Sequence, residues 1–275
     1  MSMTINTNTT AMNSLGNLNK TTRGLQSTFQ NISSGLRINN AADDAAGLGV
    51  AENLEAEQMS LRQAQRNTHD GISVIQTAEG ATNEVGDILK RMRELAVQSS
   101  SETLHNNERQ YIQDEFTQLT GEVDRIADVT EFNGISLTNA TSAGLDVQVG
   151  IHNSGDDRIN VSLGDLRATT LQVDSANLAL DNTASAQAAL TTLDSALDQV
   201  NGYRSDYGAV QNRLESTLNT LETYTENVAA SESRIRDADF AHETAEMSKF
   251  QIMQQAGVAI LGQANGISQG ALRLI

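Results

Sequence analysis

Apolar residues recur along most of this chain at alternating spacings of three and four, the repeat of helices that pack against other helices. The most regular run returns at every seventh residue and predicts a long helix that carries Leu193, Val200, Tyr207, Leu214, Leu221, Val228 and Ile235. The second set of heptad positions on this helix is less consistently apolar, because it includes Arg204 and Gln211. We therefore expect this helix to pack within a bundle and not as a two-stranded zipper.

Two further amphipathic runs predict the other helices of that bundle. The first runs from about Asp44 to Ser99, and its apolar face carries Val85, Leu89, Met92 and Leu95. The second carries Ile112, Phe116, Leu119, Val123 and Ile126. Asp43 is expected to cap the first of these helices, since a carboxylate at a helix N-terminus accepts backbone N–H bonds and is favoured by the helix dipole.

A narrow apolar seam lies at each end of the chain. The first comprises Leu15, Leu18, Leu25, Phe29, Ile32 and Leu36, with Thr22 completing the heptad spacing. The second comprises Phe250, Met253, Gly257, Ile260, Ala264, Ile267 and Ala271. These seams predict terminal helices that pack on each other or on copies of themselves. Because a lone helix of this kind is marginal in water, we expect the ends to be poorly ordered alone and helical on association.

The only strand-like region is 132–166, where apolar and polar residues alternate on either side of a turn at 153–157. It predicts a small β-hairpin against the bundle, followed by a Ser/Thr/Asn/Ala-rich connection over about 168–188. The expected fold is therefore mainly α, with long antiparallel helices in a bundle, a small β-hairpin, and N- and C-terminal helices paired as a coiled coil. Residues 1–43 and 235–275 should form the terminal domain, and 44–234 the bundle.

The charge pattern separates the two ends from the middle. The 275 residues carry a net charge of −17, and all 35 acidic residues lie between Asp43 and Glu246. Nucleic-acid binding is disfavoured, because phosphate contacts need a basic surface. The chain has no proline to break long helices and no cysteine for disulfides or thiolate metal sites. We also expect no membrane insertion, since no apolar stretch reaches the length of a membrane span.

Candidate catalytic groups are few, and we expect neither enzymatic activity nor a cofactor. The segment His242-Glu243-Thr244-Ala245-Glu246 resembles the zinc-protease sequence H-E-x-x-H, but its fifth position is Glu and the second imidazole is missing. The acid pairs Asp43-Asp44 and Asp156-Asp157 lack the spacing of a calcium loop. No metal site is expected from these residues.

Long motifs at both ends resemble bacterial flagellin, the subunit of the flagellar filament. At the N-terminal end they are Ile5-Asn6-Thr7-Asn8, Ile32-Ser33-Ser34-Gly35-Leu36-Arg37-Ile38-Asn39, Ala42-Asp43-Asp44-Ala45-Ala46-Gly47 and Arg93-Glu94-Leu95-Ala96-Val97-Gln98. At the C-terminal end they are Glu232-Ser233-Arg234-Ile235-Arg236-Asp237-Ala238-Asp239 and Gln254-Gln255-Ala256-Gly257. The resemblance covers about residues 1–140 and 190–275. The short connection at 168–188 then stands where larger relatives insert outer domains.

The resemblance implies a secreted subunit that assembles head-to-tail with itself into the extracellular filament used for motility. It also implies an export chaperone, the flagellar type III export apparatus, a distal cap and hook-junction proteins as partners. Some flagellins are bound by a host Toll-like receptor, and the matching residues here are Arg91, Leu95, Gln98 and Glu115.

Two alternatives come from other classes of protein. A hook–filament junction protein has similar end sequences, and electron microscopy would separate it because only flagellin should form long filaments alone. An enzyme displayed on a filament is the second alternative, and zinc binding at micromolar metal would favour it.

Overall fold

The computed structural model describes residues 7–139, 144–174 and 178–272, and gives the backbone alone for 267–272. Within these residues the fold is mainly α, as the heptad repeats predicted. The helices are α1 (Thr9–Ser34), α2 (Ala45–Ser99), α3 (Asn106–Val129), α4 (Thr183–Arg236) and α5 (Phe240–Leu272). The strands are β1 (Glu131–Phe132), β2 (Ile135–Ser136), β3 (Leu145–Gln148) and β4 (Arg158–Val161).

The chain divides into two compact units. The first, here called the terminal unit, comprises Met1–Gln58 and Glu226–Ile275, and the second, the central unit, is Met59–Thr225. These limits differ from the expected division at residues 43 and 235. The difference arises because the boundaries of the units fall within the two long helices and not at the loops that precede α2 and follow α4. Residues 45–58 of α2 and 226–236 of α4 therefore belong to the terminal unit.

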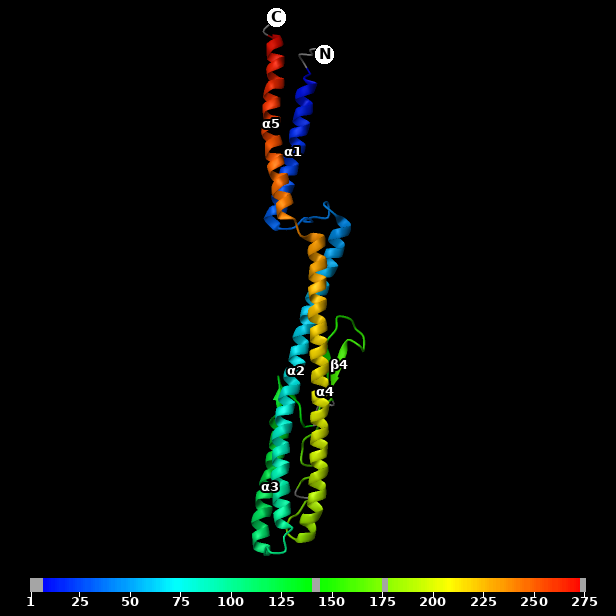
Figure 1. Cartoon of the computed structure of the whole chain (residues 1–275), viewed down its shortest axis with the longest axis vertical. Helices are drawn as coiled ribbons and strands as arrows, with labels where there is room; N and C mark the ends of the chain where they lie inside the picture. Colours follow the sequence, from blue (N-terminus) through cyan, green and yellow to red (C-terminus); the bar gives the residue numbers. More distant parts are fainter. Residues whose placement is uncertain (1–6, 140–143, 175–177, 273–275) are drawn as a thin grey trace. The chain divides into compact units, whose positions relative to one another are not determined.

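In the central unit α4 runs antiparallel to α2 (Figure 1). A β-carbon added to Gly86 of α2 would lie 3.7 Å from Val200 of α4, and one added to Gly71 would lie 3.5 Å from Leu214. The heptad positions predicted for α4 are confirmed as its buried face, because all from Leu193 to Val228 are at most 6% exposed. Only Ile235, near the end of the helix, is half-buried.

The face of α2 that meets this seam is made largely of small and hydroxyl residues. It consists of Leu61, Ala64, Thr68, Gly71, Ile75, Ala78, Thr82, Val85, Leu89, Met92, Ala96 and Ser99, all of them buried. The hydroxyls of Thr68 and Thr82 donate to the carbonyls of Ala64 and Ala78, at 2.8 and 2.7 Å. These bonds within the helix satisfy the polar atoms, so that two long helices can approach closely without an unpaired buried group.

A buried arginine holds the end of the bundle where α2 gives way to α3. Arg109 of α3 is 6% exposed. Its guanidinium donates to the carbonyls of Ser99 and Ser101, at 3.0 and 2.6 Å, and to the hydroxyl of Thr183 at 3.2 Å. The cation thus satisfies carbonyls at the C-terminus of α2, where the helix dipole favours positive charge, and ties them to the start of α4.

The connection between the β3–β4 hairpin and α4 is packed into the core over its described residues, 165–174 and 178–182. Its apolar side chains Leu166, Ala168, Leu171, Val173, Leu178 and Leu180 are buried with those of the three helices. We call this segment the strap. The expected limit of 188 was wrong, because α4 already begins at Thr183. Its composition did not indicate this packing, since the apolar residues are spaced among Ser, Thr and Asn.

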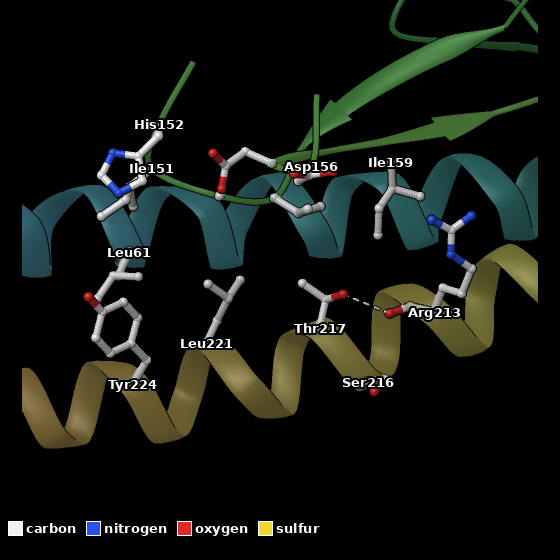
Figure 2. Close-up of a pocket in the computed structure, with 13 residues that line it drawn as sticks. Leu61, Ile151, His152, Asp156, Ile159, Arg213, Ser216, Thr217, Leu221 and Tyr224 are labelled. Atoms are coloured by element: carbon white, nitrogen blue, oxygen red, sulfur yellow. Dashed lines mark hydrogen bonds between the residues drawn. The ribbon is translucent and has the colours of Figure 1, made fainter. Parts of the chain in front are cut away.

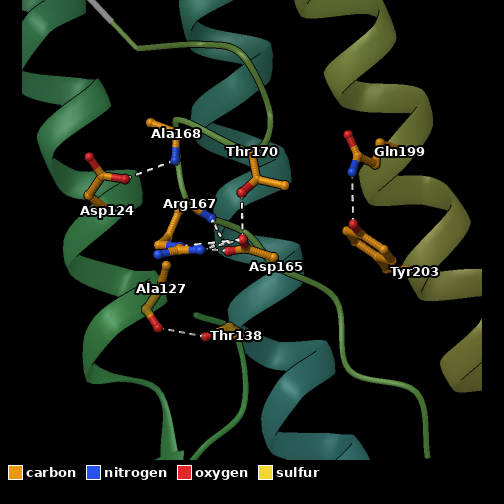
Figure 3. Close-up of polar contacts among 9 residues, drawn as sticks. All are labelled: Asp124, Ala127, Thr138, Asp165, Arg167, Ala168, Thr170, Gln199 and Tyr203. Carbon is orange, nitrogen blue, oxygen red and sulfur yellow. Dashed lines mark hydrogen bonds and ion pairs between the residues drawn. The ribbon is translucent and has the colours of Figure 1, made fainter. Parts of the chain in front are cut away.

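Polar bonds hold the strap against α3 (Figure 3). The Ala168 N–H donates to the Asp124 carboxylate at 2.8 Å, and the Thr120 hydroxyl donates to the Val173 carbonyl at 3.3 Å. Within the strap, the Asp165 carboxylate accepts bonds from the Arg167 guanidinium and the Thr170 hydroxyl. The strap therefore packs directly against α3.

The predicted β-hairpin is confirmed by β3 and β4, and the region 132–166 contains in addition a second, separate two-stranded sheet. In this additional sheet, β1 and β2 are joined by the tight turn Asn133-Gly134, where both residues have positive φ, 50° and 77°. This is the pattern of a type I′ turn, which suits the twist of the strands. In the predicted hairpin, β3 pairs antiparallel with β4, and its Val149 and Val161 are buried against α2 and α4.

The expected helix cap is also corrected by one residue. The carboxylate of Asp44, not of Asp43, accepts the Gly47 N–H at 2.8 Å and caps α2. Asp43 instead accepts the N–H groups of Asn39 and Asn40, at 3.1 and 2.9 Å, and closes the loop before the helix. The acid pair therefore has structural partners on both sides.

Candidate functional site: the terminal helix pair

In the terminal unit, α1 and α5 lie side by side (Figure 1) as an antiparallel pair. Two glycines set the closeness of approach. A β-carbon added to Gly24 would lie 2.6 Å from Cζ of Phe250, and one added to Gly257 would lie 3.2 Å from Cδ1 of Leu18. Each glycine thus leaves room for a large side chain of the other helix.

Asparagines of α1 bond to α5 toward both ends of the pair. The Asn31 amide donates to the Glu243 carboxylate at 3.1 Å, and the Asn8 amide donates to the Ala264 carbonyl at 3.1 Å. The Asn8 side chain also accepts the Ala11 N–H and caps α1. Together with the glycine contacts, these bonds fix a single register of the two helices.

The residues that face the partner helix differ in part from the predicted seams. On α1 the predicted Leu18, Thr22, Leu25 and Ile32 are half-buried, but Ser14 and Thr28 are more buried than the predicted Leu15 and Phe29, and Thr21 is half-buried beside Thr22. On α5 the predicted Phe250, Gly257 and Ala264 are at least half-buried, but the intervening positions are Gln254 and Leu261. Each helix therefore shares every seventh residue with its predicted seam. The predicted seam residues that are exposed, Leu15 and Phe29 on α1 and Met253 and Ile260 on α5, each lie one position away from a residue that is buried or half-buried.

This displacement leaves large apolar side chains of α1 in solvent. Leu15 is 50% exposed and Phe29 is 57% exposed, and Met12, one turn before Leu15, is 66% exposed. We call these three residues the ridge. Leu15 and Phe29 directly follow Ser14 and Thr28, the small residues that face α5, and Met12 lies one turn before Leu15. Burial of side chains of this size stabilises an interface by about 1.5–3 kcal/mol each.

A groove of about 510 Å³ lies on another face of the same pair. Its α5 wall contains Phe250, Met253, Ala256, Gly257 and Ile260, and its α1 wall contains Ser14, Asn17, Leu18, Lys20 and Thr21. Met253 and Ile260 remain 38% and 54% exposed. None of the ridge residues lines the groove. The predicted seam residue Ile267 lies beyond the side chains that the structure describes.

The two chain segments that lead out of the pair are also bonded to each other. Leu36 and Asp237 form an antiparallel bridge, and the Arg37 N–H donates to the Arg236 carbonyl at 2.7 Å. The Arg236 guanidinium pairs with the Glu55 carboxylate at 2.7 Å. These bonds join the segment that follows α1 to the segment that precedes α5, within the terminal unit.

Three of the four residues matched to an immune-receptor surface lie exposed in the central unit. Arg91 pairs with Glu115 at 2.8 Å across α2 and α3, and the hydrogen bonds that its guanidinium donates to Glu115 and Glu94 raise the pKa of Arg91. Gln98 is exposed as well. Leu95, by contrast, is 1% exposed and packs in the core. It can support this surface from beneath but does not form part of it.

The central unit has a second groove, of about 480 Å³, between the β3–β4 loop and the helices α2 and α4 (Figure 2). Leu61, Ile159 and Leu221 line it together with His152, Asp156 and Arg213. Within the described residues, no three His, Asp or Glu side chains lie close enough to hold a metal ion.

Two residues of the incomplete zinc-protease motif make structural contacts. Glu243 accepts the Asn31 amide, Glu246 pairs with Lys249 at 2.9 Å, and His242 is exposed. The other three histidines are exposed too. Among the described helices, none has a stretch apolar enough and long enough to cross a membrane.

Similarity to known proteins extends over nearly the whole chain. Residues 5–143 match the family model of the bacterial flagellin N-terminal helical region, and residues 190–275 match that of the C-terminal helical region. A flagellin of Halalkalibacterium halodurans is 44% identical over 273 residues, which cover 99% of this chain and 100% of that protein. The flagellar filament 33 kDa core protein of Treponema phagedenis is 39% identical over 287 residues, with the same coverage. The crystal structure of Bacillus cereus flagellin is 31% identical, with a TM-score of 0.51, and the match covers 61% of this chain and 94% of that one.

Proposed function

Because this chain belongs to the bacterial flagellin family and is a structural subunit of a flagellar filament, not an enzyme, we propose that its subunits join through the ridge and the groove of their terminal helix pairs. The observation that carries this proposal is that both apolar surfaces lie on the same pair but do not overlap. A contact between two different surfaces is heterologous, and when it does not close into a ring it builds a helical filament.

Charge supports the assignment of the contact to the ends. The 35 acidic residues all lie between Asp43 and Glu246, so α1 carries none and α5 carries none beyond Glu246. Burying α1 and the groove face of α5 against another subunit therefore encloses no carboxylate beyond that point, and each buried charge would be costly without a partner. The strongly acidic central unit is better suited to the solvated part of the filament.

The exposed apolar residues also make the free subunit dependent on other proteins before assembly. A partner that covers Ile252, Val258 and Ile260, which are at least 54% exposed, would keep unassembled chains apart. We assign this role to an export chaperone, followed by passage through the flagellar type III export apparatus. We further propose that assembly takes place outside the cell, between hook-junction proteins and a distal cap.

Recognition by a host Toll-like receptor is proposed for the surface of Arg91, Gln98 and Glu115. The Arg91–Glu115 ion pair holds two of these side chains in one exposed position across α2 and α3. Binding of purified receptor ectodomain to the full chain, compared with the Gln98→Ala and Glu115→Ala variants, tests this assignment. Unchanged affinity in both variants would contradict it.

Electron microscopy of the purified chain after addition of filament seeds tests the assembly role. We expect long filaments from the full chain and none after deletion of residues 1–30 or 250–275, which removes one helix of the pair. Robust filaments from both truncations would contradict assembly through the ends. Failure of the full chain to extend seeds, with binding at their tips only, would favour a hook–filament junction protein instead.

A further inference from the structure

The sulfur-containing side chains are distributed unevenly between the two proposed contact surfaces and the core. The chain has seven methionines and no cysteine, so thioethers are its only side-chain sulfur. Met12 on the ridge is 66% exposed, and Met253 in the groove wall is 38% exposed, whereas Met92 in the core is 0% exposed. Each of the two surfaces therefore presents one oxidisable group to solvent.

We propose that Met12 and Met253 are oxidation sites through which peroxides block the growth of the filament. This inference rests on the proposed joining of subunits through the ridge and the groove. The thioether sulfur attacks one oxygen of hydrogen peroxide, the O–O bond breaks, and the products are one methionine sulfoxide and one water. The sulfur is oxidised and the peroxide is reduced, so no further reactant is needed.

The effect of oxidation on docking follows from the surroundings of Met253. Met253 lies in a wall with Phe250, Gly257 and Ile260, whereas the polar lining residues of the groove belong to the α1 wall. Sulfoxide formation turns a flexible apolar group into a polar one. When a second subunit covers the apolar wall, the sulfoxide oxygen loses water and gains no hydrogen-bond donor from the side chains of Phe250 and Ile260. Oxidation therefore disfavours docking while leaving the central unit, where Met92 is enclosed, folded.

Reversibility is part of the proposal. Methionine sulfoxide is reduced by methionine sulfoxide reductases, one enzyme for each epimer of the sulfoxide. In the filament, both sites would be covered and protected. The susceptible form is therefore the subunit before it is incorporated, and the block is lifted when the sulfoxides are reduced.

The test treats the purified full chain with hydrogen peroxide, maps each sulfoxide by peptide mass spectrometry, and measures growth on filament seeds. We expect Met12 and Met253 to oxidise well before Met92, and seeded growth to fall by about tenfold. After the same treatment, the variant Met12→Leu/Met253→Leu should keep growth within about twofold of its own untreated level, because leucine has no sulfur to oxidise. The matched control Met59→Leu removes a 60% exposed methionine of the central unit and should lose growth like the wild type.

Two results would overturn the proposal. One is an equal loss of growth in the Met12→Leu/Met253→Leu variant, which would place the sensitive group elsewhere, for example at the half-buried Met247. The other is full growth of wild-type chain that carries sulfoxide at both positions. Failure of the proposed assembly itself is distinguishable, because the untreated wild type would then not extend seeds at all.

Discussion

The ring of Phe250 lies directly over Gly24, so close that a β-carbon added to the glycine would come within 2.6 Å of Cζ. The pair joins residues from opposite ends of the chain. It sets both the distance and the register of α1 and α5, and thereby decides which side chains face inward and which form the ridge and the groove.

Gly24→Ala should therefore weaken filament growth although alanine is the better helix former. The added methyl group overpacks the contact, at a cost of about 1–3 kcal/mol, which outweighs a helix-propensity gain of about 1 kcal/mol. Gly16→Ala is the matched control, because no atom lies within 4 Å of a β-carbon added there. Seeded sedimentation should show slower growth for Gly24→Ala only. Equal growth of the two variants would show that the Phe250 contact does not govern the pairing.

Removal of the buried guanidinium should destabilise the central unit. Arg109→Met leaves the carbonyls of Ser99 and Ser101 without their donor, and we expect a loss of about 2–3 kcal/mol of unfolding free energy. Arg125→Ala is the control, since its 59% exposed side chain pairs with Glu122 of its own helix, and its removal should cost less than about 0.5 kcal/mol. Urea unfolding followed by circular dichroism measures both. A change below about 1 kcal/mol in Arg109→Met would refute the role assigned to Arg109.

The strap should contribute to acid sensitivity through Asp165. Burial opposes ionisation of this carboxyl, but hydrogen bonds from the Arg167 side chain, the Thr170 hydroxyl and the Arg167 N–H outweigh burial and lower its pKa. A group with a lowered pKa stabilises the fold above its unfolded pKa, near 4, and this contribution is lost as pH falls through the folded value.

Asp165→Asn should accordingly be less stable than the wild type at about pH 7, and the gap should narrow at about pH 3. Asp87→Asn serves as the control, because the Asp87 side chain is 72% exposed and its pKa is lowered mainly by Lys90 next to it. Urea midpoints at the two pH values provide the comparison. A gap for Asp165→Asn that stays constant between them would contradict the proposed linkage.

The long helices were predictable where large residues mark the buried face. Leu193, Tyr207 and Leu214 identify the seam of α4 by hydropathy alone. The matching face of α2 was not predicted over most of its length, because Thr68, Gly71 and Thr82 are buried there and hydropathy does not distinguish them from surface residues. Their bonds to carbonyls of the same helix become evident only with coordinates.

The terminal seams show a second limit of the sequence pattern. Leu15, Leu18 and Phe29 fit one heptad seam, and Leu18 with Ser14 and Thr28 fits another. The large residues favoured the first. The fold uses the second, because close pairing with α5 requires small side chains between the helices. The strap was missed for a related reason: its apolar residues are isolated, and only their common burial shows that they belong to the core.

Seeded growth of matched surface variants tests the central claim most directly. Leu15→Gln/Phe29→Gln alters the ridge, Met253→Gln/Ile260→Gln alters the groove, and Val129→Gln is the control on a 62% exposed residue of α3. We predict that each double variant keeps its helical content, by circular dichroism, yet extends seeds at least about tenfold more slowly, since about 1.4 kcal/mol of lost burial suffices for that change. Val129→Gln should grow like the wild type. Wild-type growth of either double variant would contradict assembly through these two surfaces.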